Sequence, residues 1–125
     1  MSDRPIKLLL VDDERAFVDI LANRFGRRNI DVTKTYSGSE AIQAVRQQDF
    51  DVAVLDLKME DIDGIEVLKI LKKMLPSLAV IMLTGHGSER AARAGIEHGA
   101  YDYLTKPCEF SELLAKIREV AERET

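Results

Sequence analysis

Short apolar segments alternate with longer amphipathic ones along the whole chain, and this alternation constrains the fold more than any other feature. Residues 6–11, 52–55 and 79–83 are almost entirely apolar, which is typical of strands buried on both faces of a parallel sheet. Residues 30–36 are more polar, so we expect a strand at the sheet edge there. Residues 101–104 are predicted to form a fifth, short strand.

The segments between these strands carry the marks of helices. Ser37 precedes Glu40 by three residues, the spacing of a capping box, and Asp63 precedes Glu66 in the same way. Ser88 can cap a fourth helix. Apolar residues recur at helical spacing in the first and last helices: Phe17, Ile20, Leu21 and Phe25, and then Phe110, Leu113, Leu114, Ile117 and Val120. Five strand–helix units predict one domain over residues 1–125, of the α/β class, with a doubly wound parallel sheet and helices on both faces.

Charge and composition exclude several classes of protein. The formal net charge is −4, with 22 acidic and 18 basic residues, so direct binding of nucleic acid is not expected. No apolar run approaches the roughly 20 residues of a membrane span, and the first residues do not resemble a signal peptide. The single cysteine, Cys108, precludes an internal disulfide. We therefore expect a cytoplasmic protein that does not enter a membrane.

Chemically active side chains follow four of the predicted strands. In an open parallel sheet, the carboxyl ends of the strands meet at one edge, where ligands bind. We therefore expect these side chains to lie close together, although they are far apart in the sequence. They are Asp12, Asp13 and Glu14 after the first strand, Asp56 after the third, Thr84 after the fourth, and Lys106 with Pro107 after the fifth.

This set of side chains suits phosphoryl chemistry. Clustered carboxylates repel one another unless a cation relieves them, and Mg²⁺ prefers oxygen ligands. A lysine supplies a second positive charge for phosphate oxygens, and a threonine hydroxyl can donate to another. A carboxylate nucleophile in such a site would form an acyl phosphate.

Four segments of the chain resemble the receiver domains of two-component response regulators, the CheY-like superfamily. They are LLLVDDE, VAVLDLKMEDIDG, VIMLTGHG and GAYDYLTKP, and their order and separations match along essentially the whole chain. The resemblance implies a flavodoxin-like sheet with strand order 2-1-3-4-5 and five helices. It also implies a signalling domain rather than an enzyme, limited to Mg²⁺-dependent self-phosphorylation and autodephosphorylation.

The resemblance implies a role for each matching residue. Asp56 would accept the phosphoryl group from a sensor histidine kinase or a phosphotransfer protein, assisted by Lys106 and Thr84. Asp13, Asp56 and the backbone carbonyl of Lys58 would bind Mg²⁺, for which Mn²⁺ can substitute, and Asp12 would hold a metal-bound water.

Further residues would transmit and time the signal. Thr84 and Tyr103 would switch together, the Lys106–Pro107 bond would be cis, and the side chains of Lys58 and His86 would tune dephosphorylation. The switch would alter the surface of the fourth helix, fifth strand and fifth helix, and so control an output domain or partner. That surface could also form a phosphorylation-dependent homodimer, with Asp102 meeting Lys116 and Arg93 meeting Glu112 across a two-fold axis.

Alternative interpretations accompany these expectations. Asp12 and Asp13 could simply cap the first helix, Tyr103 could be packing, and Lys106 could be a solvated lysine. A nucleotide or flavin binder would need a Gly-, Ser- or Thr-rich loop after the first strand, where this chain has acids. A metal-dependent phosphatase would need a second acid at the position of Lys58. A degenerate receiver that acts only as a scaffold would lack some of the chemical residues, all of which are present.

Overall fold

A five-stranded parallel sheet forms the middle layer of the computed structural model, which describes residues 4–85 and 89–122. The strand order is β2-β1-β3-β4-β5, which confirms the predicted order, with the more polar strand at one edge. The chain places β2 on one side of β1 and then places β3, β4 and β5 in turn on the other side. The strands are β1 (Ile6–Val11), β2 (Ile30–Thr35), β3 (Val52–Asp56), β4 (Ala79–Thr84) and β5 (Asp102–Thr105).

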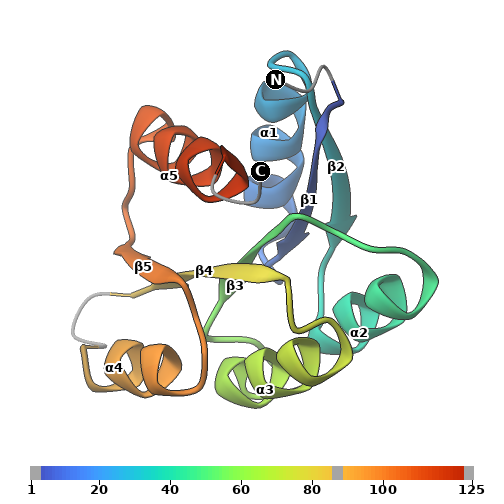
Figure 1. The fold of residues 1–125 in the computed structure, drawn as a ribbon. Coiled ribbons are helices and arrows are strands. Elements are labelled where there is room, and N and C mark those ends of the chain that lie inside the picture. Colours follow the sequence, from blue (N-terminus) through green and yellow to red (C-terminus); the bar gives the residue numbers. More distant parts are fainter. Residues whose placement is uncertain (1–3, 86–88, 123–125) are drawn as a thin grey trace.

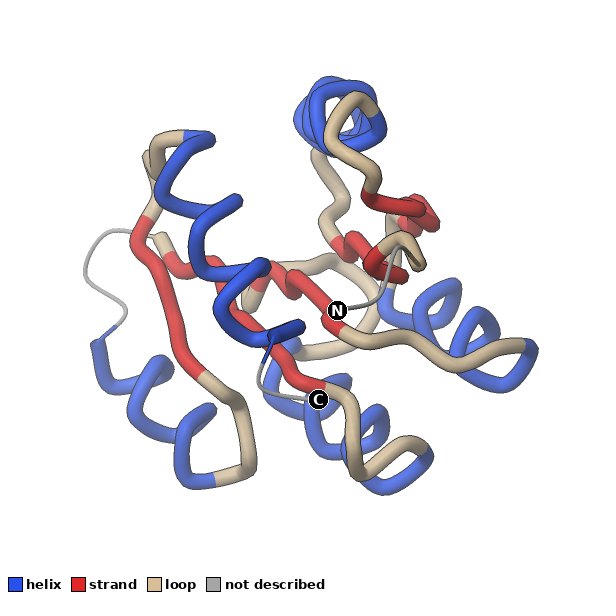
Figure 2. Tube along the Cα trace, turned by 45° about the horizontal axis from the view of Figure 1, so that its top comes forward, coloured by secondary structure: helices blue, strands red, loops and turns tan. Residues whose placement is uncertain are grey.

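Five helices cover the two faces of this sheet. Figure 1 shows α1 and α5 on one face and α2, α3 and α4 on the other, and Figure 2 shows the same three layers from another direction. None of the five has the length and apolar character that a membrane span requires. The helices are α1 (Arg15–Gly26), α2 (Gly38–Gln47), α3 (Gly64–Met74), α4 (Glu89–Glu97) and α5 (Phe110–Glu122).

The period-two geometry of the strands builds two apolar cores, one on each face of the sheet. Leu8 and Leu10 pack in the core that includes the inner faces of α1 and α5. Leu9 and Val11 pack in the other core, against α2 and α3. Successive strand side chains point to opposite faces. A strand covered by helices on both faces is therefore apolar at every position, which explains the continuous apolar runs of the sequence.

The predicted helix starts are observed at α2 and α3. The Ser37 hydroxyl accepts a hydrogen bond from the Glu40 amide, and the Asp63 carboxylate accepts one from the Ile65 amide. Ser88, predicted to cap α4, lies outside the described residues. The fifth strand begins at Asp102, one residue later than predicted.

The two strands at the centre of the site run one residue further than the apolar pattern indicates. Asp56 ends β3 and Thr84 ends β4, where they pair in register with Leu83 and Thr105. Their backbones continue the sheet while their side chains stand at its carboxyl edge. A strand terminus is a rigid support, so the sheet holds both polar groups in place.

Candidate functional site

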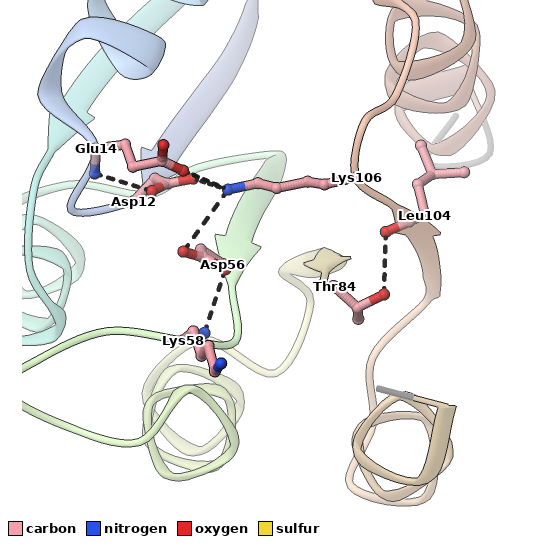
Figure 3. A network of polar contacts seen from close by, with 7 residues as sticks. All are labelled: Asp12, Glu14, Asp56, Lys58, Thr84, Leu104 and Lys106. Carbon is pink, nitrogen blue, oxygen red and sulfur yellow. Dashed lines mark hydrogen bonds and ion pairs between the residues drawn. The ribbon is translucent and has the colours of Figure 1, made fainter. Parts of the chain in front are cut away.

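Acidic and basic groups from three strand ends converge at the carboxyl edge of the sheet. Asp12 follows β1, Asp56 ends β3, and Lys106 follows β5. Figure 3 shows these three side chains pointing toward one another. Asp12 is 3% exposed and Asp56 is 6% exposed, which is rare for carboxylates without a partner. The structure thus brings together side chains that the sequence predicts to meet.

The Lys106 ammonium is the hub of this cluster. Its Nζ lies 2.8 Å from Asp12 Oδ2, 3.1 Å from Glu14 Oε1 and 3.8 Å from Asp56 Oδ2. Its side chain also lies over the Phe17 ring, with Nζ 4.7 Å from the ring centroid. Burial alone would lower the pKa of Lys106, but its hydrogen bond to Asp12 and the charges of Asp12 and Asp56 outweigh burial and raise it. Lys106 is therefore a fixed cation of the site and not a solvated surface lysine.

Asp56 resists ionisation in this setting. Its burial, and then the nearby charge of Asp12, raise its pKa to about 6, while the Lys58 amide and Lys106 act in the opposite direction. The Lys58 amide donates to Asp56 Oδ1 at 3.2 Å and holds one carboxylate oxygen in place. A single ammonium thus leaves this group of carboxylates with surplus negative charge.

The donor atoms of the cluster fit a hard divalent cation. Asp12, Asp13 and Asp56 each offer a carboxylate oxygen, and these oxygens lie within 4.8 Å of one another. Mg²⁺ and Mn²⁺ prefer carboxylate oxygen ligands, and a bound cation would offset both the burial of Asp56 and the charge of Asp12, which raise the pKa of Asp56. Asp13 is more exposed than Asp12 and Asp56, so the cluster is open on the side where further ligands would enter.

Asp12 also supports the entry into α1. Its Oδ1 accepts a hydrogen bond from the Glu14 amide at 3.0 Å, while its Oδ2 faces Lys106. Glu14 occupies the cap position of α1, and its side chain makes no cap hydrogen bond. The capping interpretation therefore accounts for only one oxygen of Asp12, and the other belongs to the charged cluster.

The Thr84 hydroxyl points away from Asp56. It donates to the Leu104 carbonyl oxygen on β5 at 3.5 Å, the long end of the hydrogen-bond range (Figure 3). Tyr103, the neighbour of Leu104, is partly exposed at 36%. The Lys106–Pro107 peptide bond is cis. Thr84 is thus in contact with the backbone of β5, so a movement of Thr84 can be transmitted to β5.

The remaining predicted residues are more scattered. The side chain of Lys58 is exposed, and His86 lies outside the described residues. Lys116 Nζ lies 2.9 Å from Asp102 Oδ2 of the same chain, so the pair expected between two copies is already formed within one. Arg93 is exposed on α4, and the Glu112 carboxylate lies 3.6 Å from the Cys108 thiol.

Two polar contacts, one in the site and one in the loop after β3, are not predicted by the sequence pattern. Glu14 follows the first strand, but the sequence pattern does not predict its contact with Lys106. Asp61, in the loop after β3, accepts hydrogen bonds from the first residues of α2. Asp61 stands two residues before Asp63, and nothing else in the sequence indicates its role. The residues that donate to Asp61 lie more than twenty positions earlier in the chain.

Comparisons with known proteins agree on one family. A family model described as "Response regulator receiver domain" matches residues 8–118. The transcriptional regulatory protein GlrR of Escherichia coli (strain K12) is 32% identical over 123 residues, which cover 98% of this chain and 28% of that protein. The chain therefore spans little more than a quarter of the length of this curated relative.

Solved structures are similar over nearly the full chain. The receiver domain of the Francisella response regulator 1452 has a TM-score of 0.89 and 32% identity, and the match covers 96% of this chain and 99% of that one. A CheY-like response regulator receiver domain protein from Methanospirillum hungatei JF-1 has a TM-score of 0.92 and 28% identity, covering 96% of each chain.

Proposed function

Because the chain belongs to the receiver-domain family of two-component response regulators, we propose that it accepts a phosphoryl group on Asp56 with the help of Mg²⁺. The donor is a phosphohistidine of a sensor kinase or of a phosphotransfer protein, and we expect the reaction in the cytoplasm. The observation that carries the proposal is the position of Asp56. It is a buried carboxylate at a strand end, 3.8 Å from the Lys106 ammonium and beside two further acids.

The transfer exchanges one phosphorus bond for another. A carboxylate oxygen of Asp56 attacks the phosphorus of the phosphohistidine, the P–N bond breaks, and a P–O bond forms. The released imidazole nitrogen keeps the bonding electron pair and takes up a proton from solvent. The product is an acyl phosphate. Lys106 lies where it can pair with the oxygens of the incoming phosphoryl group.

The proposed metal ligands are Asp13, Asp56 and the backbone carbonyl of Lys58, with Asp12 holding a metal-bound water. Bound Mg²⁺ supplies positive charge that offsets the carboxylates and the phosphoryl oxygens during transfer. Asp12 and Glu14 hold Lys106 beside the position that the phosphoryl group would take. The Lys58 amide fixes the Asp56 carboxylate, which orients its free oxygen for attack.

Thr84 and Tyr103 are proposed to convert phosphorylation into a change of surface. The phosphoryl group adds about two negative charges beside Asp56. Thr84 then exchanges its long contact with the Leu104 carbonyl for a phosphoryl oxygen, and Tyr103 moves toward the space that Thr84 leaves. A free energy of a few kcal/mol is enough to shift such a two-state equilibrium. The altered surface is that of α4, β5 and α5.

This surface is proposed to control an output domain or a separate partner. GlrR is a transcriptional regulatory protein of which the match covers 28%, which is consistent with an output function outside the receiver domain in that protein. A homodimer through the same surface would rely on Arg93 and Glu112 for its rim contact, since Lys116 already holds Asp102 within one chain. Lys58 and His86 are proposed to tune the lifetime of the phosphoryl group.

The rival functions are less well supported. A flavin or a nucleotide would meet Asp12, Asp13 and Glu14 directly after β1, where such proteins need donors for phosphate oxygens. A phosphatase would need an acid in place of Lys58 to protonate the leaving group. A scaffold without chemistry would not require three carboxylates whose oxygens lie within 4.8 Å of one another.

A small phosphodonor tests the proposal without knowledge of the kinase. Acetyl phosphate and Mg²⁺ should add one phosphoryl group to the chain, detected by intact mass. The product should be stable in acid and labile in alkali, as an acyl phosphate is. A chelator should prevent the reaction. Absence of any modification with Mg²⁺ at saturating donor would refute the proposed chemistry.

A further inference from the structure

The loop that follows Asp56 is fastened to a helix that contributes no residue to the site. Asp61, midway between β3 and α3, accepts hydrogen bonds from the amides of Gly38 and Ser39, each at 3.0 Å. The Ser39 hydroxyl donates to the same carboxylate at 2.9 Å. Three bonds from the first turn of α2 thus converge on one side chain of the loop.

Packing brings the same two segments together. A Cβ atom added to Gly38 would lie 3.2 Å from the Cβ of Ile62, which shows how closely the loop approaches the start of α2. The α2 and α3 helices lie side by side on one face of the sheet (Figure 1). The exposed contact of Asp61 therefore lies beside a close packing contact between Ile62 and Gly38.

The base of the loop is closed separately. The Gly64 amide donates to the Leu57 carbonyl oxygen at 3.2 Å, and a Cβ added to Gly64 would lie 2.5 Å from Leu57 Cα. Leu57 itself donates to the Leu83 carbonyl oxygen on β4. The loop is thus held at its base by the sheet and at its tip by α2, and Lys58 lies between these two attachments.

Lys58 connects this junction to the site. Its amide donates to Asp56 Oδ1, and its carbonyl is the backbone ligand proposed for Mg²⁺. The orientation of that peptide depends on the path of the loop between its two attachments. We infer that Asp61 is a positioning residue for the magnesium site, because it ties the loop that carries the Lys58 carbonyl to the N-terminus of α2. This inference rests on the proposed function.

The hydrogen bonds from the start of α2 to the Asp61 carboxylate persist across the physiological pH range. The hydrogen bonds from the Ser39 and Gly38 amides lower the pKa of Asp61 to about 2, against the opposing effect of burial. The neighbouring Glu60 is exposed, so burial does not hold the loop at that position. The contact of Asp61 supplies a restraint at the neighbouring position.

Asp61 could instead act only as a cap of α2, and the variants Ser37→Ala and Glu60→Ala are controls for that role. Ser37 caps the same helix through the Glu40 amide and is not part of the loop. Ser37→Ala therefore weakens the start of α2 and leaves the tie intact. Glu60→Ala removes one negative charge from the same loop and leaves all three hydrogen bonds of Asp61 in place.

Two measurements on the unphosphorylated chain distinguish these roles. The first is a Mg²⁺ titration followed by amide chemical shifts. Asp61→Ala should weaken Mg²⁺ binding about tenfold, the lower end of the effect of removing a group that orients a metal ligand. Asp61→Asn keeps one acceptor oxygen and should fall between this variant and the parent. Ser37→Ala and Glu60→Ala should titrate like the parent.

The second measurement is amide hydrogen exchange without metal. In Asp61→Ala the Lys58 amide should exchange faster, together with those of Gly38 and Ser39. In Ser37→Ala the faster exchange should be confined to the start of α2. At saturating Mg²⁺, the rate of phosphorylation of Asp61→Ala by acetyl phosphate should return close to that of the parent, because Asp61 does not touch the reacting atoms.

The measurements distinguish failure of the Asp61 inference from failure of the proposed function. If the parent binds Mg²⁺ while Asp61→Ala binds it equally well and leaves Lys58 exchange unchanged, Asp61 only caps α2 and the inference is wrong. An equal loss of affinity in Ser37→Ala or Glu60→Ala would also overturn it, in favour of helix stability or charge. If the parent itself binds no Mg²⁺ among Asp12, Asp13 and Asp56, the proposed function fails and the inference fails with it.

Discussion

The Lys106 ammonium lies 2.8 Å from a carboxylate oxygen of Asp12, a residue 94 positions earlier in the chain. This pair is largely buried, and Lys106 also offsets part of the charge of Asp56. The cation is therefore both a structural counter-charge and the group expected to meet the phosphoryl oxygens. These two tasks would compete, because the proposed phosphoryl group would draw Lys106 away from Asp12.

Removal of the cation should destabilise the metal-free chain. Lys106→Ala leaves the buried Asp12 and Asp56 without their counter-charge and should lower the free energy of unfolding by about 2 kcal/mol at neutral pH. Urea unfolding in a chelator measures this loss. Lys116→Ala is the matched control, because it breaks an ion pair with Asp102 at a more exposed site and should cost about 1 kcal/mol or less. Equal losses in both variants would contradict the role of Lys106 as a buried counter-charge.

Asp13 should be the acid most specific to the metal. Asp12 pairs with Lys106, whereas Asp13 joins the carboxylate cluster from a more exposed position. Asp13→Ala should remove most of the Mg²⁺ affinity, since one of the two proposed direct carboxylate ligands is lost. Asp31→Ala removes the same charge from β2, away from the site, and serves as the control. If Asp13→Ala titrates with Mg²⁺ like the parent in the same amide-shift experiment, the ligand assignment is wrong.

The raised pKa of Asp56 predicts a pH dependence of stability. The ordinary pKa of an aspartate carboxyl is 3.8, and burial together with the charge of Asp12 raises the pKa of Asp56 to about 6 in the folded chain, so between these values the folded state binds more protons than the unfolded state. The free energy of unfolding of the metal-free chain should therefore fall as pH rises through this window and then level off. Asp56→Asn lacks this titration and should be more stable than the parent by about 1 to 2 kcal/mol at neutral pH.

Urea unfolding of both chains in a chelator, at several pH values, measures the difference. The advantage of Asp56→Asn should vanish below the lower pKa, where the parent carboxyl is protonated in both states. Mg²⁺ should stabilise the parent more than the variant. A constant difference at all pH values would mean that the substitution acts through packing rather than through ionisation.

The architecture was largely predictable because burial on both faces makes a strand apolar at every position. The boundaries of β3 and β4 were less so. Asp56 and Thr84 are polar, and the pattern assigned them to the loops, whereas they pair with Leu83 and Thr105 as the last residues of their strands. A functional side chain at a strand end interrupts the apolar pattern that marks the strand.

The site was predictable where topology decided it. Parallel strand ends share one edge, so Asp12, Asp56 and Lys106 had to meet once the strands were recognised. The contact of Asp61 with α2 depends on the path of a loop, which residue spacing does not determine. The pair of Asp102 and Lys116 forms within one chain because α5 returns beside β5, a proximity that the charge pattern alone did not reveal.

The proposed switch should change the amide chemical shifts of Thr84 and of residues beyond it on β5 and α4. Beryllofluoride with Mg²⁺, a mimic of the aspartyl phosphate, should shift the amides of Thr84, Tyr103 and α4 as well as those around Asp56. Lys106→Ala should still accept some phosphoryl group from acetyl phosphate but should lose the shifts near Tyr103, because the cation that pairs with the phosphoryl group is gone. Shifts confined to the Asp56 pocket in the parent would rule out transmission to β5.

Chemical identification of the acceptor residue is the direct test of phosphorylation at Asp56. The chain is treated with acetyl phosphate and Mg²⁺, the acyl phosphate is reduced with borohydride, and the modified residue is located by peptide mass spectrometry. The expected result is one modified residue in the parent, Asp56, and no modification in Asp56→Asn. A modification mapped to Asp12, Asp13 or any other residue of the parent, or full phosphorylation of Asp56→Asn, would contradict it.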